Sequence, residues 1–358
     1  MNMSMEEKDR KTYQDFWDWF LIHEKDFHKI ISSGKDIEEK FFNHIAPRLH
    51  EINEGFYFLA GMSDDFTAEL IITVEGELKN IIFAEEIIEQ APKIEGWKLT
   101  ALKPEIGIES VNIDLEGLKF TGENIFFYPN EFENYPDEID ITLVYEDFKE
   151  ENKEAITTGI CIFLDHFLGE LNFATQIDTF NITRKENAEK ELIPIIKLKD
   201  FLQWREREFT EKYKDEKISA HDEEFSVLEG VLDNGMPLIA AINTSLLSYE
   251  SKASYPWVSV LKIHYNGEHH QGLPDKEDFE KMKVIEENMV NALKRENGHL
   301  YIGRESADEV RENYFVSKDF REPSKVLHHI IRDNPDYKIS LDIYKDKYWQ
   351  SFESYTVN

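Results

Sequence analysis

The chain has 358 residues, of which 41% are hydrophobic and 32% charged, a length that predicts about two domains. This composition supplies enough apolar residues for buried cores and is too polar for a membrane protein or a low-complexity chain. The 73 acidic residues outnumber the 41 basic ones and give a net charge of -32, which disfavours binding to a phosphate backbone, so we expect no direct nucleic-acid partner.

The first fifty residues carry two apolar stripes at helical spacing. Phe16, Phe20, Phe27 and Ile31 belong to the first stripe, and a second stripe follows Ser32-Ser33-Gly34. The sequence therefore predicts an N-terminal helical hairpin. A crowded set of aromatic residues in the first helix predicts packing within its own domain, with a partner-binding surface as the alternative: Tyr13, Phe16, Trp17, Trp19 and Phe20.

The remainder of the first half alternates between strand-like and helix-like segments. Strands are predicted at residues 56–60, 68–74, 97–102, 118–120, 125–128, 139–145 and 174–182. Helices are predicted at residues 81–90, 150–171 and 198–213, and the apolar face of the second of these indicates that it covers a sheet. These elements predict one mostly antiparallel, helix-covered sheet after the helical hairpin.

The second half has a regular order of elements. Two strands, at residues 225–232 and 238–243, precede a βαββαβ series with strands at 257–265, 299–304, 311–316 and 337–344 and helices at 275–296 and 323–332. A helix-covered antiparallel sheet of the ferredoxin-like kind satisfies this order. The predicted fold class is therefore α+β, ending in a ferredoxin-like domain with extra N-terminal strands.

Apolar residues become sparse near residues 215–221, which places the predicted domain boundary there. The predicted domains are residues 1–217, an acidic α+β domain of unknown function, and residues 218–358, the ferredoxin-like domain. Residues 216–358 contain 26 acidic and 17 basic residues, a net charge of -9, and the residues before them carry -23. Most of the acidity therefore belongs to the first domain.

Features of secreted and membrane proteins are missing from the sequence. Cys161 is the single cysteine, so no internal disulfide can form, and residues 1–10 are charged where a secretory signal would be apolar. No run approaches the roughly 18 apolar residues of a membrane-spanning helix. We expect a cytoplasmic protein that does not associate with membranes.

The histidines do not form a recognised metal motif. His23 and His28 are five residues apart, and on a regular helix this spacing turns the second imidazole about 140° away from the first. His264, His269 and His270 near the end of a predicted strand are loosely spaced, and they are interpreted as parts of a solvated loop. The sequence predicts no metal-binding residues.

One helix carries a possible acid–base pair. His166 and Glu170 are four residues apart in the predicted helix 150–171, which is compatible with proton transfer but equally with an ordinary surface pair. The surface pair is the favoured interpretation because His166 lies off the apolar face. Cys161 has no basic neighbour in sequence that would lower the pKa of its thiol, so it is interpreted as structural.

The sequence lacks the motifs of common cofactor enzymes. It contains no phosphate-binding loop, no dinucleotide-binding glycine pattern, no nucleophile elbow, no C-x-x-C pair and no EF-hand loop. We predict no catalytic residues, no cofactor-binding residues and no cofactor. If the protein is nevertheless an enzyme, the polar residues His166, Glu170, His264 and Arg304 are the first candidates.

Residues from about 225 to 345 resemble a bacterial family known only as domain of unknown function 695. The resemblance rests on six short stretches, Asp233-Asn234-Gly235-Met236-Pro237, Ile242-Asn243, Tyr255-Pro256-Trp257, Gly272-Leu273-Pro274, Tyr301-Ile302-Gly303-Arg304 and Tyr314-Phe315-Val316. These are turn residues with the strands that they bound, so the resemblance implies a fold and no activity. By element order and acidity, this half is also similar to the regulator of ribonuclease E activity B, a small acidic protein that inhibits an RNA-processing nuclease by binding it.

These observations favour a non-enzymatic binding or regulatory protein. Its acidic surface would meet a basic protein partner, because complementary charge accelerates association and sharpens selectivity. The alternative is an enzyme or small-ligand binder with a site at the interface of the two domains. The sequence does not determine the oligomeric state.

Overall fold

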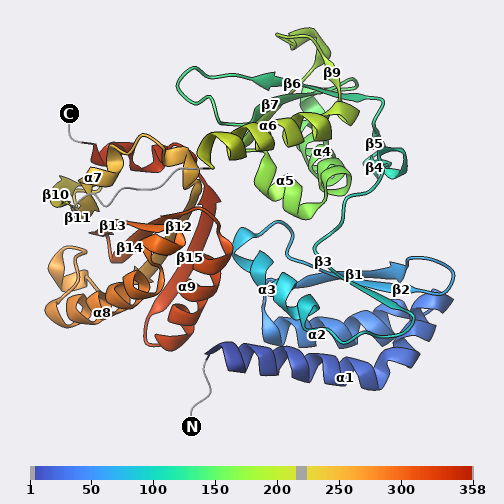
Figure 1. The fold of residues 1–358 in the computed structure, drawn as a ribbon, viewed down its shortest axis with the longest axis horizontal. Helices are drawn as coiled ribbons and strands as arrows, with labels where there is room; N and C mark the ends of the chain where they lie inside the picture. Colours follow the sequence, from blue (N-terminus) through green and yellow to red (C-terminus); the bar gives the residue numbers. More distant parts are fainter. Residues whose placement is uncertain (1–4, 215–223, 357–358) are drawn as a thin grey trace. The chain divides into compact units, whose positions relative to one another are not determined.

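The computed structural model describes residues 5–214 and 224–356 and divides into two compact units (Figure 1). The first unit comprises Met1–Glu131 and Ile139–Glu206, and the second comprises Phe132–Glu138 and Arg207–Asn358. The predicted boundary between residues 217 and 218 lies outside the described residues and stays a prediction. Within the described part of the chain, no helix is both long enough and apolar enough to cross a membrane.

The first unit begins with the predicted helical hairpin, built from α1 (Met5–Ser33) and α2 (Asn43–Ile52) with the π-helical turn η1 (Glu38–Phe42) before α2. Four of the five clustered aromatic residues in α1 are buried, and Trp19 is half-buried under the guanidinium of Arg48. The indole of Trp17 donates a hydrogen bond of 2.7 Å to the Ile87 carbonyl in α3 (Leu78–Glu89). The aromatic cluster therefore packs within its own unit.

The hairpin packs against a three-stranded sheet with the order β1-β2-β3. Its strands are β1 (Tyr57–Met62), β2 (Ala68–Thr73) and β3 (Trp97–Ala101). β1 and β2 are antiparallel, whereas β2 and β3 are parallel and joined through α3. A connection that contains a helix is what allows two neighbouring strands to run in the same direction.

The rest of the first unit forms a second core. A two-stranded sheet consists of β4 (Ile113–Leu115) and β5 (Leu118–Phe120). A four-stranded sheet has the order β8-β7-β6-β9, formed by β6 (Ile125–Asn130), β7 (Asp140–Tyr145), β8 (Thr179–Thr183) and β9 (Ile193–Pro194). The apolar faces of α4 (Lys153–Leu168) and α6 (Leu198–Tyr213) join this core.

The single sheet predicted for the first half is wrong, because these strands form three separate sheets. Most pairs are antiparallel as predicted, but β2 with β3 and β7 with β8 are parallel. Each parallel pair is separated in the sequence by helices, α3 in the first case and α4 with α5 (Glu170–Gln176) in the second. Local alternation identifies a strand but does not specify which strand it pairs with.

The second unit is one six-stranded antiparallel sheet with the order β10-β11-β13-β14-β12-β15. Its strands are β10 (Phe225–Val231), β11 (Pro237–Asn243), β12 (Trp257–His264), β13 (His299–Ala307), β14 (Val310–Ser317) and β15 (Lys338–Lys345). The helices α8 (Lys276–Ala292) and α9 (Arg321–Asp333) complete the predicted βαββαβ order. The α+β class is thus confirmed, and the ferredoxin-like assignment stays a prediction.

Different elements pack on the two faces of this sheet. Met282 and Met289 of α8 and Leu327 of α9 pack with Leu261 and Phe315 of the sheet in one core. Residues of the other face pack in a second core against the short α7 (Thr244–Leu247), which follows β11, and against η9 (Gln350–Tyr355) in the C-terminal segment. β10 contributes only the partly buried Leu228 to these cores, so it lies at the margin of the packed region.

A short segment, Phe132–Glu138, belongs to the second unit although the residues on both sides of it belong to the first. Its anchor is Asp137, whose carboxylate accepts hydrogen bonds from Lys212 Nζ, the Tyr213 hydroxyl and the Tyr348 hydroxyl at 2.7–2.8 Å. Lys347 Nζ donates to the Asp137 carbonyl at 2.6 Å. Burial opposes ionisation of Asp137, but these donors outweigh it and hold the pKa of the carboxyl below its usual value of 3.8.

We expect Asp137→Asn to lower the free energy of unfolding of the second unit by about 1–2 kcal/mol, since Lys212 is half-exposed and its contribution is screened by solvent. Because the folded pKa is depressed, this contribution is present above pH 3.8 and is lost as the pH falls through the folded pKa. Urea unfolding of both proteins at pH 7 and near pH 3 measures it. Equal stabilities at pH 7 would contradict the anchoring role of Asp137.

Candidate functional site

The best-defined polar site in the first unit forms where one helix ends and the next begins. The sequence predicts a single helix over residues 150–171, but the structure breaks it at Gly169, whose φ of +80° is unfavourable for other residues. A Cβ at this position would lie 2.8 Å from the Glu105 nitrogen. Residues 103–106 cross the break, where Ile106 N donates to the His166 carbonyl and Glu170 N donates to the Lys103 carbonyl.

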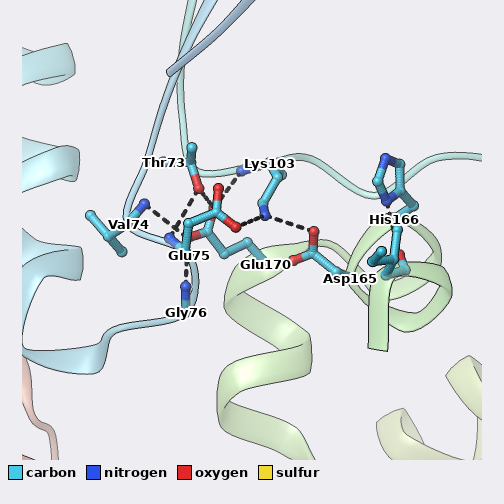
Figure 2. A network of polar contacts seen from close by, with 9 residues as sticks. Thr73, Val74, Glu75, Gly76, Lys103, Asp165, His166 and Glu170 are labelled. Carbon is cyan, nitrogen blue, oxygen red and sulfur yellow. Dashed lines mark hydrogen bonds and ion pairs between the residues drawn. The ribbon is translucent and has the colours of Figure 1, made fainter. Parts of the chain in front are cut away.

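The carboxylate of Glu170 is the centre of this site (Figure 2). Its Oε1 accepts hydrogen bonds from the main-chain nitrogens of Val74 and Gly76, at 3.0 and 2.9 Å. Its Oε2 accepts from the Thr73 hydroxyl at 2.6 Å and from the Lys103 nitrogen at 2.9 Å. The side chain is 1% exposed, so four donors replace water around a buried carboxylate.

Lys103 links this centre to two further carboxylates. Its Nζ lies 2.9 Å from Glu75 Oε2 and 2.8 Å from Asp165 Oδ2. Burial alone would lower the pKa of Lys103, but the two ion pairs outweigh it and raise the pKa above 10.5. Burial raises the pKa of Asp165 despite the opposing effect of Lys103. The Lys103 ammonium is thus charged at neutral pH and forms ion pairs with both carboxylates.

Several of these residues line a cavity of about 610 Å³, a size within the usual range for small-molecule sites. Carboxylates of Glu75, Asp165, Glu170 and Asp178 line it together with Lys103, which gives the lining a net charge of -3 with His166 neutral. Its apolar part is formed by Leu59, Ile162, Phe173, Ile177 and Phe180. The cavity is therefore amphipathic and acidic.

The potentially reactive groups at this cavity are not arranged for nucleophilic catalysis. His166 donates its Nδ1 proton to the Ile162 carbonyl at 2.9 Å, and its imidazole lies outside the contacts around Glu170 (Figure 2). Burial, with a smaller contribution from Asp165, raises the pKa of the Cys161 thiol above 9.0, so the thiol is protonated at neutral pH. The predicted pairing of His166 with Glu170 is wrong, because the helix breaks between them and Glu170 binds other partners.

A second cavity, of about 640 Å³, lies in the second unit. Its charged lining residues are the four carboxylates Glu268, Asp278, Glu309 and Asp336, and its remaining lining residues are His264, Tyr265, Asn266 and Tyr337. Asp278 accepts a hydrogen bond from the Tyr337 hydroxyl at 2.7 Å, and Glu309 accepts one from the Gly267 nitrogen at 3.1 Å. Glu268 and Asp336 are exposed. The lining carries a net charge of -4 with His264 neutral.

Two loops with unusual backbone conformations build this cavity. Gln271, Asp308 and Glu309 have positive φ values of 55°, 47° and 67°. The loops are tied together because the Tyr265 hydroxyl donates to the Gly272 carbonyl and Glu309 N donates to the same oxygen, both at 2.9 Å. Burial raises the pKa of Tyr265 to about 12, so this hydroxyl remains a donor at neutral pH.

The enzyme candidates do not assemble into one site within either unit. His166 and Glu170 belong to the first unit and His264 to the acidic cavity of the second. Arg304, also in the second unit, donates from Nη1 to Glu286 Oε1 at 2.5 Å, beside the Tyr301 hydroxyl. The described residues include no group of three or more metal-binding side chains at ligand distance.

Sequence reasoning missed Lys103 and Glu309 as residues of these cavities. Lys103 lies 67 residues from Glu170, and their contact leaves no periodic signal. Glycine offered a partial indication, since Gly169 and Gly272 stand where the backbone must turn sharply or approach another segment closely.

Residues 231–356 match the family described as "Family of unknown function (DUF695)". This match covers the second unit from the end of β10 onwards, and it includes every lining residue of the acidic cavity. No curated protein and no solved structure matches the chain. The looser likeness to the regulator of ribonuclease E activity B stays a prediction.

We expect Glu170→Gln to lower the free energy of unfolding by about 3 kcal/mol, because an amide nitrogen would face buried donors that the carboxylate now satisfies. Glu75→Gln is the matched control, since Glu75 is half-exposed and its ion pair contributes at most about 1 kcal/mol. Chemical denaturation of the two variants and the unmodified protein gives both values. If the two substitutions cost the same, Glu170 is not the centre of the network.

Proposed function

We propose that the protein is a non-enzymatic binding or regulatory protein that recognises a basic segment of a protein partner. The observation that carries this proposal is the acidic cavity of the second unit, which four carboxylates line without a lysine or arginine among them. A lysine or arginine side chain of a partner would enter this cavity and neutralise part of its charge. The charge complementarity would supply selectivity.

The carboxylates of the cavity have different roles in this proposal. Asp278 accepts a hydrogen bond from the Tyr337 hydroxyl, and Glu309 accepts one from the Gly267 nitrogen, so both carboxylates shape the cavity. Glu268 and Asp336 are exposed, which leaves their oxygens available to an ammonium or guanidinium group from outside. The recognition residues are therefore Glu268 and Asp336.

The charge of the rest of the chain supports the same partner. The first unit contains 41 acidic and 21 basic residues, a net charge of -20. A negative electrostatic field increases the association rate of a basic partner, and added salt reduces this effect by screening the field. The first unit would thus contribute to association rate and the cavity of the second unit to specificity.

A fluorescent lysine-rich peptide tests this proposal by anisotropy at low and high salt. The double variant Glu268→Gln with Asp336→Asn should weaken binding about tenfold, which corresponds to about 1.4 kcal/mol for two lost charge contacts. The same peptide with acetylated lysines should bind neither protein, because acetylation removes the charge.

The control is a second double variant, Asp233→Asn with Glu250→Gln, which removes the same charge from exposed positions outside the cavity. It should bind the peptide nearly as well as the unmodified protein. Equal weakening by both double variants would show that only the overall charge matters, and the cavity would lose its assigned role.

The amphipathic cavity of the first unit favours a second candidate function, the binding of a small molecule. Its apolar wall beside Phe173 and Phe180 and its net charge of -3 fit a ligand with an apolar body and a cationic amine. Such a ligand would place its amine near Asp165 and its apolar part near the phenylalanines.

A thermal-shift comparison of hexylamine, hexanol and hexanoate tests this second function. The amine should raise the melting temperature most, and Phe173→Ser should remove the effect by making the apolar wall polar. Equal responses to all three compounds would exclude recognition of a cation in this cavity.

A further inference from the structure

The outermost strand of the six-stranded sheet, β10, has only one neighbouring strand among the described residues. It pairs with β11 without interruption from Phe225 with Asn243 to Val231 with Pro237. A strand at the edge of a sheet presents a row of main-chain donors and acceptors that can pair with another strand. β10 is a regular strand of seven residues with no bulge and no proline.

The hydrogen bonds at both ends of β10 show which residues face outwards. Thr244 N donates to the Glu224 carbonyl at one end, and Leu232 N donates to the Met236 carbonyl at the other. In an antiparallel pair every second residue bonds to the neighbour, so the even-numbered residues of β10 face β11. The main-chain groups of Phe225, Val227, Glu229 and Val231 therefore point away from the sheet.

The side chains of these same residues share one exposed face. Phe225 is 44% exposed, Val227 69% and Val231 74%, and Ile239 on the neighbouring strand is 39% exposed. Glu229 is the only charged residue in the strand. Natural edge strands are commonly protected by charges, prolines or bulges. The opposite edge strand, β15, follows this rule with Lys338, Asp342 and Lys345, but β10 does not.

We propose that β10 pairs with β10 of a second copy of this chain, antiparallel and centred on Leu228, which joins the two sheets across a two-fold axis. Phe225 then lies opposite Val231 of the other copy, and Val227 lies opposite Glu229. All four outward-facing residues of each strand find hydrogen-bonding partners in this register. The two Leu228 residues face each other at a position without main-chain hydrogen bonds, where the Cα atoms approach to about 4.5 Å.

Charge and length select this register over its neighbours. A pairing centred on Glu229 would place the two carboxylates directly opposite each other, which is destabilising. A pairing centred on Val227 would leave the apolar Val231 beyond the end of the partner strand. In the register centred on Leu228, the carboxylates occupy diagonal positions, about 7–8 Å apart and open to solvent.

The family match begins at Val231, so β10 lies almost entirely outside the matched residues. A single strand pair is a small interface, and we expect the dimer to dissociate on dilution.

Light scattering of the full chain over a range of concentrations tests this proposal, and the expected result is a concentration-dependent dimer of a 42.3 kDa protomer. Val227→Pro should raise the dissociation constant at least about tenfold, because it removes an outward N–H that β11 does not use. Val227→Glu should act similarly, because it would place a carboxylate directly opposite Glu229 of the other copy. Val284→Glu, at an exposed valine of α8, should leave the dimer unchanged.

A cross-link tests the register itself. In a chain whose single cysteine is replaced, Cys161→Ala, the substitution Leu228→Cys should give a disulfide-linked dimer under mild oxidation. Val284→Cys in the same background should not. A chain that stays monomeric at all concentrations would overturn the proposal, as would a dimer unaffected by both Val227 variants. A dimer that Leu228→Cys fails to cross-link would overturn the register.

Discussion

The architecture of the first unit depends on one buried carboxylate. Glu170 accepts hydrogen bonds from the turn after β2 and from the segment after β3, and these segments lie 94–97 and 67 residues away in the chain. Because the side chain is almost wholly buried, water cannot reach the four donors, and a donor that lost its bond to Glu170 would stay unsatisfied. The break at Gly169 is what brings this glutamate to the start of a new helix, facing those two segments.

The carboxylates that make the chain acidic thus have more than one physical role. Glu170 and Asp137 are internal anchors whose oxygens are occupied by donors of the same unit, and they are not available to a partner. Glu268 and Asp336 at the cavity of the second unit are exposed, and they can meet a cation from outside. The net charge of -32 counts anchoring and exposed carboxylates alike. Only the contacts of each carboxylate distinguish an anchor from a recognition group.

The second unit shows a similar contrast between its two sheet edges. β15 carries charged residues, whereas β10 exposes valines and a phenylalanine beside main-chain groups that pair with no strand among the described residues. The acidic cavity is lined by residues of the loops at 265–268 and at 309, by Asp278 of α8 and by residues next to β15. The proposed pairing instead uses β10, the first strand in the sheet order. Partner recognition and self-association could therefore occur through different residues of the same sheet.

The sequence by itself determined the elements with strong local periodicity. It predicted α6 at residues 198–213 as found, and it predicted the βαββαβ order, because the period of apolar residues depends only on the helix or strand that they form. The tertiary structure alone decided that the first half forms three sheets and that His166 and Glu170 belong to different helices. It also decided which carboxylates are anchors. The reason is that strand pairing and buried hydrogen bonds join residues tens of positions apart, and local periodicity carries no information about such partners.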